Sequence, residues 1–178
     1  MSLIKGETFV ENVFTVLADE QDVPLGRAII VSLKRWQAEG EQLAKRTTAV
    51  GVRLTSDQAP DLLGDDIHRL AVIALEFPKF RDGRGYSWAR MARQRLGYKG
   101  EIRAVGDVLR DQWLFMRRCG IDAFEVKPGT RIEDFRAAQA ELTVFYQRSS
   151  DAVINVLALR HNRGASTRGS RGLAHAAE

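Results

Sequence analysis

The chain has 178 residues and a mass of 19.9 kDa, which is the size of one domain. Hydrophobic residues make up 44% of it and charged residues 28%, so an apolar core can form and wholesale disorder is excluded. No apolar run is long enough to span a bilayer, and residues 1–7 lack the pattern of a secretory signal. The single cysteine, Cys119, excludes an internal disulfide and a cysteine-built metal or iron–sulfur site. We therefore expect a soluble cytoplasmic protein that holds no metal or cofactor and does not bind membranes.

The net charge of +4 is distributed unevenly. Residues 79–118 contain 11 Lys or Arg against 4 Asp or Glu, whereas residues 1–78 carry a negative excess. Such an Arg-rich segment suits a nucleic acid, a small anion or an acidic partner protein. The alternative for the helical arginines, which we favour, is an ordinary solvated helix face.

Hydrophobic periodicity and turn residues predict alternating strands and helices along the chain. Strands are expected at residues 8–17, 28–33, 50–54, 71–77, 101–105 and 123–126. Helices are expected at residues 37–46, 61–70, 87–96 and 107–119, and a last one from residue 130 onward. We predict helix N-caps at Ser87 and Asp107, and a capping box formed by Thr130 and Glu133.

This alternation predicts an α/β fold with about five parallel strands and an extra N-terminal strand. An open doubly wound sheet and a partial (β/α) barrel would look alike in sequence. We favour the open sheet, because five units cannot close an eight-unit barrel. A single α/β domain is expected over residues 1–160. Residues 161–178 lack an apolar period and are expected to form a flexible basic tail.

The carboxyl ends of parallel strands gather along one sheet edge, where most α/β proteins bind their ligands. The longest segment at this edge, residues 78–87, combines two glycines and two arginines around an aspartate before a predicted helix. Glycines permit close backbone approach and arginines can bind an oxyanion with two hydrogen bonds, so we predict an anion site. The candidate residues are Arg81, Asp82, Gly83, Arg84, Gly85, Ser87, Arg103, Asp107, Arg110 and Asp111.

Two other interpretations of these residues stay open. Asp82 or Asp107 could pair with Arg84, Arg103 or Arg110 and only pin neighbouring βα units together. Asp107 and Asp111 could also form a carboxylate pair for acid–base chemistry or Mg²⁺, although a capping role for Asp107 fits its position better. No catalytic residue can be assigned, and we expect no metal site.

Residues 71–126 carry a longer pattern, which includes Glu76-Phe77-Pro78-Lys79-Phe80-Arg81-Asp82-Gly83-Arg84-Gly85 and Gly106-Asp107-Val108-Leu109-Arg110-Asp111. This pattern resembles a bacterial family classed as a domain of unknown function, and the resemblance extends over residues 4–155. Members of that family are labelled as oxidoreductases and are encoded beside the sulfite reductase haemoprotein and phosphoadenylyl-sulfate reductase in sulfate-assimilation operons. The resemblance implies a pathway and leaves open whether the protein is an enzyme, since no flavin, nicotinamide or sirohaem motif is present.

The first functional hypothesis is therefore an accessory protein of assimilatory sulfate or sulfite reduction. It would bind one of those two reductases, or a small oxyanion metabolite, through the Arg- and Asp-rich edge. The second hypothesis is a small enzyme acting on a sulfated or phosphorylated substrate. A nucleic-acid-binding module ranks last, because we expect no exposed aromatic residues interleaved with the arginines of the central region, which stacking on bases would require.

The composition of the tail supports a first prediction. Deleting residues 163–178 should shift the melting temperature by less than about 5 °C, because a segment without an apolar stripe has nothing to dock with. Thermal unfolding followed by circular dichroism measures this directly. A larger decrease would show that the tail packs against the domain.

Overall fold

The computed structural model describes residues 1–146, 148–151 and 156. It contains one eight-stranded sheet with the strand order β2-β1-β8-β7-β6-β5-β4-β3. The strands are β1 (Ser2–Lys5), β2 (Thr8–Val10), β3 (Phe14–Val16), β4 (Ala28–Ser32), β5 (Val50–Leu54), β6 (Val72–Phe77), β7 (Glu101–Gly106) and β8 (Ala123–Val126). Neighbouring strands from β3 to β8 are parallel, whereas β1 is antiparallel to both β8 and β2.

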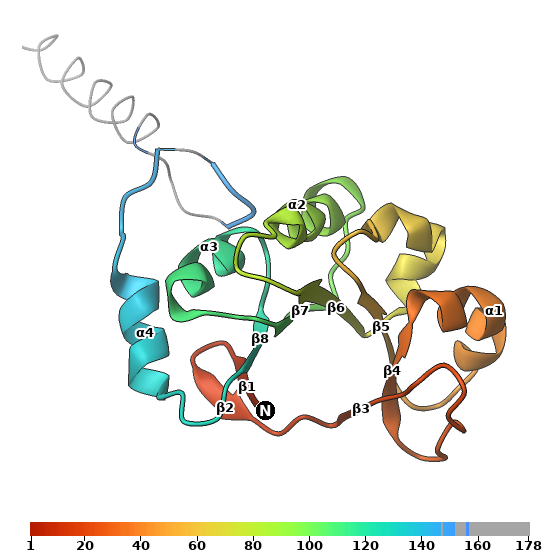
Figure 1. The fold of residues 1–178 in the computed structure, drawn as a ribbon. Coiled ribbons are helices and arrows are strands. Elements are labelled where there is room, and N and C mark those ends of the chain that lie inside the picture. The colour runs from red at the N-terminus through yellow and green to blue at the C-terminus, as the bar shows by residue number, and fades with distance from the viewer. Residues whose placement is uncertain (147, 152–155, 157–178) are drawn as a thin grey trace, which may run out of the picture.

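Helical segments connect the parallel strands from β4 to β8 and lie outside the curl of the sheet (Figure 1). The α-helices are α1 (Leu33–Leu43), α2 (Arg84–Arg90), α3 (Trp113–Arg118) and α4 (Ile132–Ala140). The 3₁₀-helices are η1 (Pro60–Arg69) and η3 (Arg110–Gln112), and the π-helix η2 (Met91–Arg95) continues α2. No helix of the described residues is long and apolar enough to cross a membrane.

The predicted α/β class is confirmed, and the partial barrel describes the sheet better than the doubly wound alternative that we favoured. A doubly wound sheet reverses its strand order at a switch point. Here the parallel strands follow one another from β3 to β8 in sequence order, so each βα unit adds one strand on the same side of the last. This repeated step leaves the helices on the convex face only and makes the sheet curl (Figure 1).

The two edges of the sheet lie close together, because only residues 11–13 separate β2 at one edge from β3 at the other. A chain advances at most about 3.6 Å per residue, so Val10 and Phe14 are no more than roughly 14 Å apart. Figure 1 shows this connection crossing the open side of the curl. The sheet is therefore a barrel left open between β2 and β3.

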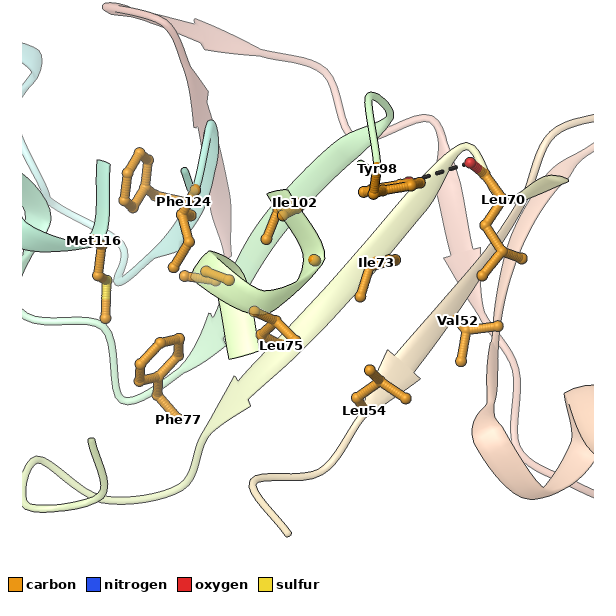
Figure 2. Close-up of a cluster of buried hydrophobic side chains, with 14 of the residues drawn as sticks. Val52, Leu54, Leu70, Ile73, Leu75, Phe77, Tyr98, Ile102, Met116 and Phe124 are labelled. Carbon is orange, nitrogen blue, oxygen red and sulfur yellow. Dashed lines mark hydrogen bonds between the residues drawn. The ribbon is translucent and has the colours of Figure 1, made fainter. Parts of the chain in front are cut away.

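Alternation along the strands gives the sheet two different faces. The convex face carries the main core, to which adjacent strands contribute Val52, Leu54, Ile73, Leu75, Ile102 and Phe124 (Figure 2). Burying this many aliphatic and aromatic side chains provides the largest stabilisation of the fold. The Tyr98 hydroxyl, also buried there, donates a hydrogen bond to the Leu70 carbonyl at 3.1 Å and so has a partner.

The concave face contains a buried charge. Arg103 of β7 is 1% exposed, and its guanidinium contacts Glu101 Oε1 at 2.7 Å and Glu125 Oε1 at 3.7 Å. It also donates to Asn12 Oδ1 at 2.8 Å and lies 5.4 Å from the Phe14 ring centroid. Because Asn12 belongs to the segment between β2 and β3, this network ties the crossing connection to the middle of the sheet.

Two predicted elements differ from the structure. The strand expected over residues 8–17 is two strands, β2 and β3, on opposite sheet edges. The helix expected over residues 61–70 is the 3₁₀-helix η1, broken at Gly64, where φ is +53°. Glycine reaches this left-handed region without a steric penalty, so the chain kinks there.

The predicted caps are also wrong. Helix α2 begins at Arg84, so Ser87 lies inside it and is not its N-cap. Asp107 precedes the irregular start of η3 and pairs instead with Lys127 at 3.1 Å. The Thr130 hydroxyl donates to the Lys127 carbonyl at 2.8 Å, and α4 has no side-chain cap. For Asp107 and Thr130, a tertiary or turn contact takes the place of the predicted cap.

One helical arginine is not the solvated residue that we expected. Arg93 of η2 donates to Asp122 at 2.8 Å and 3.0 Å. Its remaining donors reach the carbonyls of Tyr98, Gly100 and Gly120 at 2.7–2.9 Å. A single guanidinium thus satisfies three loop carbonyls at the amino ends of β7 and β8, which fixes the position of both loops.

The concave network supports a second prediction. Arg103→Met should lower the free energy of unfolding by about 2–3 kcal/mol, because it removes the cation that partly buried Glu101 and Glu125 share, while Glu101 keeps its ion pair with Lys5 at 2.7 Å. The control is Arg53→Met on the same face. Its ion pair with Glu76 at 3.1 Å is solvent-accessible and should contribute at most about 1 kcal/mol. Urea denaturation of both variants tests this, and equal losses would contradict a special role for Arg103.

Candidate functional site

The segments that follow the parallel strands β3 to β8 form the carboxyl edge of the sheet, and most of the predicted site residues follow β6 and β7. The β6–α2 loop, residues 78–83, is the longest segment that the sequence singled out there. Gly85, at the start of α2, is buried, and a Cβ on it would lie 2.5 Å from the Phe77 ring. Gly85 therefore permits α2 to pack closely on β6, so its absent side chain is explained by packing.

Arg84 is held by Asp82. Its Nε donates to Asp82 Oδ1 at 2.9 Å and its Nη2 to Asp82 Oδ2 at 2.7 Å, which is a two-point ion pair. The Arg84 Nη2 group also donates to the Ser56 hydroxyl at 2.8 Å, and Trp88 Nε1 donates to the Ser56 carbonyl at 2.9 Å. These bonds join the β5 and β6 loops, so Arg84 already has a carboxylate partner.

The same pair controls the ionisation of this edge. The Arg84 guanidinium and the Ser56 hydroxyl both hydrogen-bond the Asp82 carboxylate and hold its pKa far below the usual value of 3.8. A hydrogen bond from the Thr55 hydroxyl, 2.6 Å away, lowers the pKa of Asp57 next to them. Both carboxylates are thus ionised at neutral pH, which rules them out as proton donors there.

Arg84, Asp107 and Arg110 are held in three separate ion pairs. Asp107 pairs with Lys127, and Arg110 pairs with Glu141, just past the end of α4, at 2.7 Å. Asp111 is exposed, and it has no cation within 4.0 Å among the described residues. No group of three or more His, Cys, Asp or Glu in the described part of the chain could hold a metal ion.

The remaining candidates fall into different places. Arg103 does not lie at the carboxyl edge. It lies in the network on the concave face, where two carboxylates already share its charge. Gly83 and Ser87 are exposed, Gly83 at the N-cap position of α2 and Ser87 within it. The candidate residues therefore lie in different local settings. Residues 81–83 are in the β6–α2 loop, Arg84 begins α2, and residues 107–111 follow the neighbouring strand β7.

The feature that sequence reasoning missed is Phe80. Its side chain is 53% exposed between Lys79 and Arg81, which are exposed as well. Neither cation has a carboxylate within 4.0 Å among the described residues. We call Lys79, Phe80 and Arg81 the basic loop. Its signal in the sequence was an aromatic residue between two cations, directly after a strand-ending proline.

A comparison with protein families shows which part of the chain is similar to a known family. A family model described as "Bacterial protein of unknown function (DUF934)" matches residues 51–156, which is more than half of the chain. The chain belongs to this family. A comparison with curated protein sequences gives no match. The DUF934 segment runs from β5 past the end of α4, so it includes the basic loop and the Asp82–Arg84, Asp107–Lys127 and Arg110–Glu141 ion pairs.

The Asp82–Arg84 pair supports a third prediction, on pH dependence. Because the folded-state pKa of Asp82 lies below its unfolded value, the pair stabilises the protein above about pH 4. This contribution is lost as the pH falls from there through the folded-state pKa. The stability difference between wild type and Asp82→Asn should therefore shrink between pH 5 and pH 2 in urea denaturation. A difference that stays constant over this range would show that the carboxylate is not stabilised by its partners.

Proposed function

We propose that this DUF934 protein is an accessory protein of assimilatory sulfite reduction that binds the sulfite reductase haemoprotein through its basic loop. The pathway comes from the family that the sequence resembles, whose members are encoded beside that reductase. The observation that carries the binding surface is the exposure of Phe80 between two cations that have no carboxylate partner in the described structure.

The state of the other arginines favours a protein partner over an oxyanion metabolite. Arg84 and Arg110 are each paired with a carboxylate at 2.7 Å. An oxyanion would have to displace those carboxylates, or bind beside them against their negative charge. A protein surface needs no such displacement, because it can contact the three side chains of the basic loop and leave both ion pairs intact.

The composition of the basic loop also fits a protein interface. Aromatic and arginine side chains are enriched among the residues that contribute most to protein–protein affinity. Unpaired cations at the rim of such a contact increase the association rate toward an acidic surface. The expected partner surface is therefore acidic, with a pocket that accepts one aromatic ring.

The fourth prediction concerns two variants of the basic loop, which test this proposal. Phe80→Ala should weaken binding of the purified haemoprotein by about 30-fold, the effect of losing an aromatic residue worth about 2 kcal/mol. Arg81→Glu should weaken it and make the remaining affinity less dependent on salt. Titration calorimetry measures both effects.

The controls are Leu25→Ala and Lys45→Glu, exposed residues before β4 and after α1. Both residues lie near the amino ends of the parallel strands, away from the basic loop. Both variants should therefore bind the haemoprotein with the affinity of the wild type. Unchanged affinity in the loop variants would contradict the proposed surface. Binding of sulfite, sulfate or phosphoadenylyl-sulfate that disappears in Arg81→Glu, without any binding of the haemoprotein, would instead identify an oxyanion site.

A further inference from the structure

Strand β2 forms a free edge of the sheet in the described part of the chain. It pairs with β1 and with no other strand, and all three of its residues are exposed. A free edge presents unpaired backbone N–H and C=O groups, which can bind an added strand. Two apolar side chains of β2, Phe9 and Val10, are 45% and 37% exposed, and Val13 just beyond them is 63% exposed.

The register of β2 shows which side chains an added strand would meet. Phe9 lies opposite Ile4, and Ile4 packs into the core of the convex face, so Phe9 points to that side of the sheet. Glu7, in the turn before β2, and Glu11, directly after β2, flank the strand at its two ends. The edge thus presents an apolar residue between two carboxylates.

Both carboxylates are available to an incoming cation. Glu7 contacts Arg117 at 3.4 Å, and about half of each of these side chains is exposed. Glu11 is exposed and has no cation within 4.0 Å among the described residues. Exposed pairs of this kind contribute little, so a partner's charge can compete with Arg117 for Glu7.

The same carboxylates disfavour a second copy of this chain as the occupant. Two β2 strands paired antiparallel about Phe9 would bring Glu7 of each copy near Glu11 of the other. Like charges at this spacing repel each other. A basic strand meets no such repulsion at this edge.

We propose that the β2 edge binds an extended segment of a partner protein with the pattern basic–x–apolar–x–basic. The apolar residue would lie beside Phe9, and the two basic residues would lie near Glu7 and Glu11 at the two ends of β2. Backbone hydrogen bonds along β2 provide affinity, and the two carboxylates select the charge of the segment. This surface is separate from the basic loop, so the inference does not depend on the proposed function.

A peptide titration tests the proposal on the full-length protein. The probe is the capped peptide acetyl-Thr-Lys-Thr-Val-Thr-Lys-Thr-amide, and its control carries Glu in place of both Lys. At low ionic strength the Lys peptide should shift the backbone amide NMR signals of residues 8–10 and bind about tenfold more tightly than the Glu peptide. Glu11→Gln should reduce this preference about threefold, whereas Glu41→Gln, on exposed α1, should leave it unchanged.

Three results would overturn the proposal. The first is the absence of signal shifts at residues 8–10 with the Lys peptide up to its solubility limit. The second is equal affinity for the two peptides. The third is a concentration-dependent shift of the same signals without peptide, which would show that a second copy of the chain occupies the edge.

Discussion

Arg103 places a positive charge under the curl of the sheet, where almost none of its side chain meets solvent. A charge in such a place is tolerated only when partners surround it, and here Glu101, Glu125 and Asn12 do so. Because Asn12 lies between β2 and β3, neutralising the charge also holds the chain across the open side of the barrel. The contacts that neutralise Arg103 are thus the same contacts that hold residues 11–13 across the open side of the barrel.

This arrangement leaves little of either sheet face free to bind a ligand or a partner protein. Helices cover the convex face, and the Arg103 network and the segment around Phe14 occupy part of the concave face. Exposed features suited to binding occur at the carboxyl edge and along β2. At the carboxyl edge most cations are paired within the chain, which leaves the basic loop as the part with unpaired charge and an exposed ring.

Part of this arrangement could be predicted from the sequence. Apolar runs located β5 and β8 to the residue, and the alternation of strands and helices predicted a parallel sheet. The choice between open sheet and partial barrel depended on the three-residue connection that brings the sheet edges together. That connection lay inside a stretch with the composition of one strand, so composition alone could not reveal it.

The candidate site was harder to predict for a related reason. Arg103 was grouped with the edge arginines because it lies near them in sequence. Its position two residues after Glu101 in a buried strand puts both on one face, which was a readable signal for an internal ion pair. The partners of Asp107 and Arg110 lie 20 and 31 residues away. Local spacing cannot identify such pairs.

The central functional claim is that the basic loop is the surface that contacts the reductase. Amine-reactive cross-linking of the protein with sulfite reductase haemoprotein, followed by mass spectrometry, tests it without any substitution. Lys79 is exposed in the basic loop, whereas exposed Lys45 lies after α1, near the amino end of β5. We predict that cross-links to the haemoprotein concentrate at Lys79. Cross-links at Lys45 with none at Lys79, or none to the haemoprotein at all, would contradict this claim.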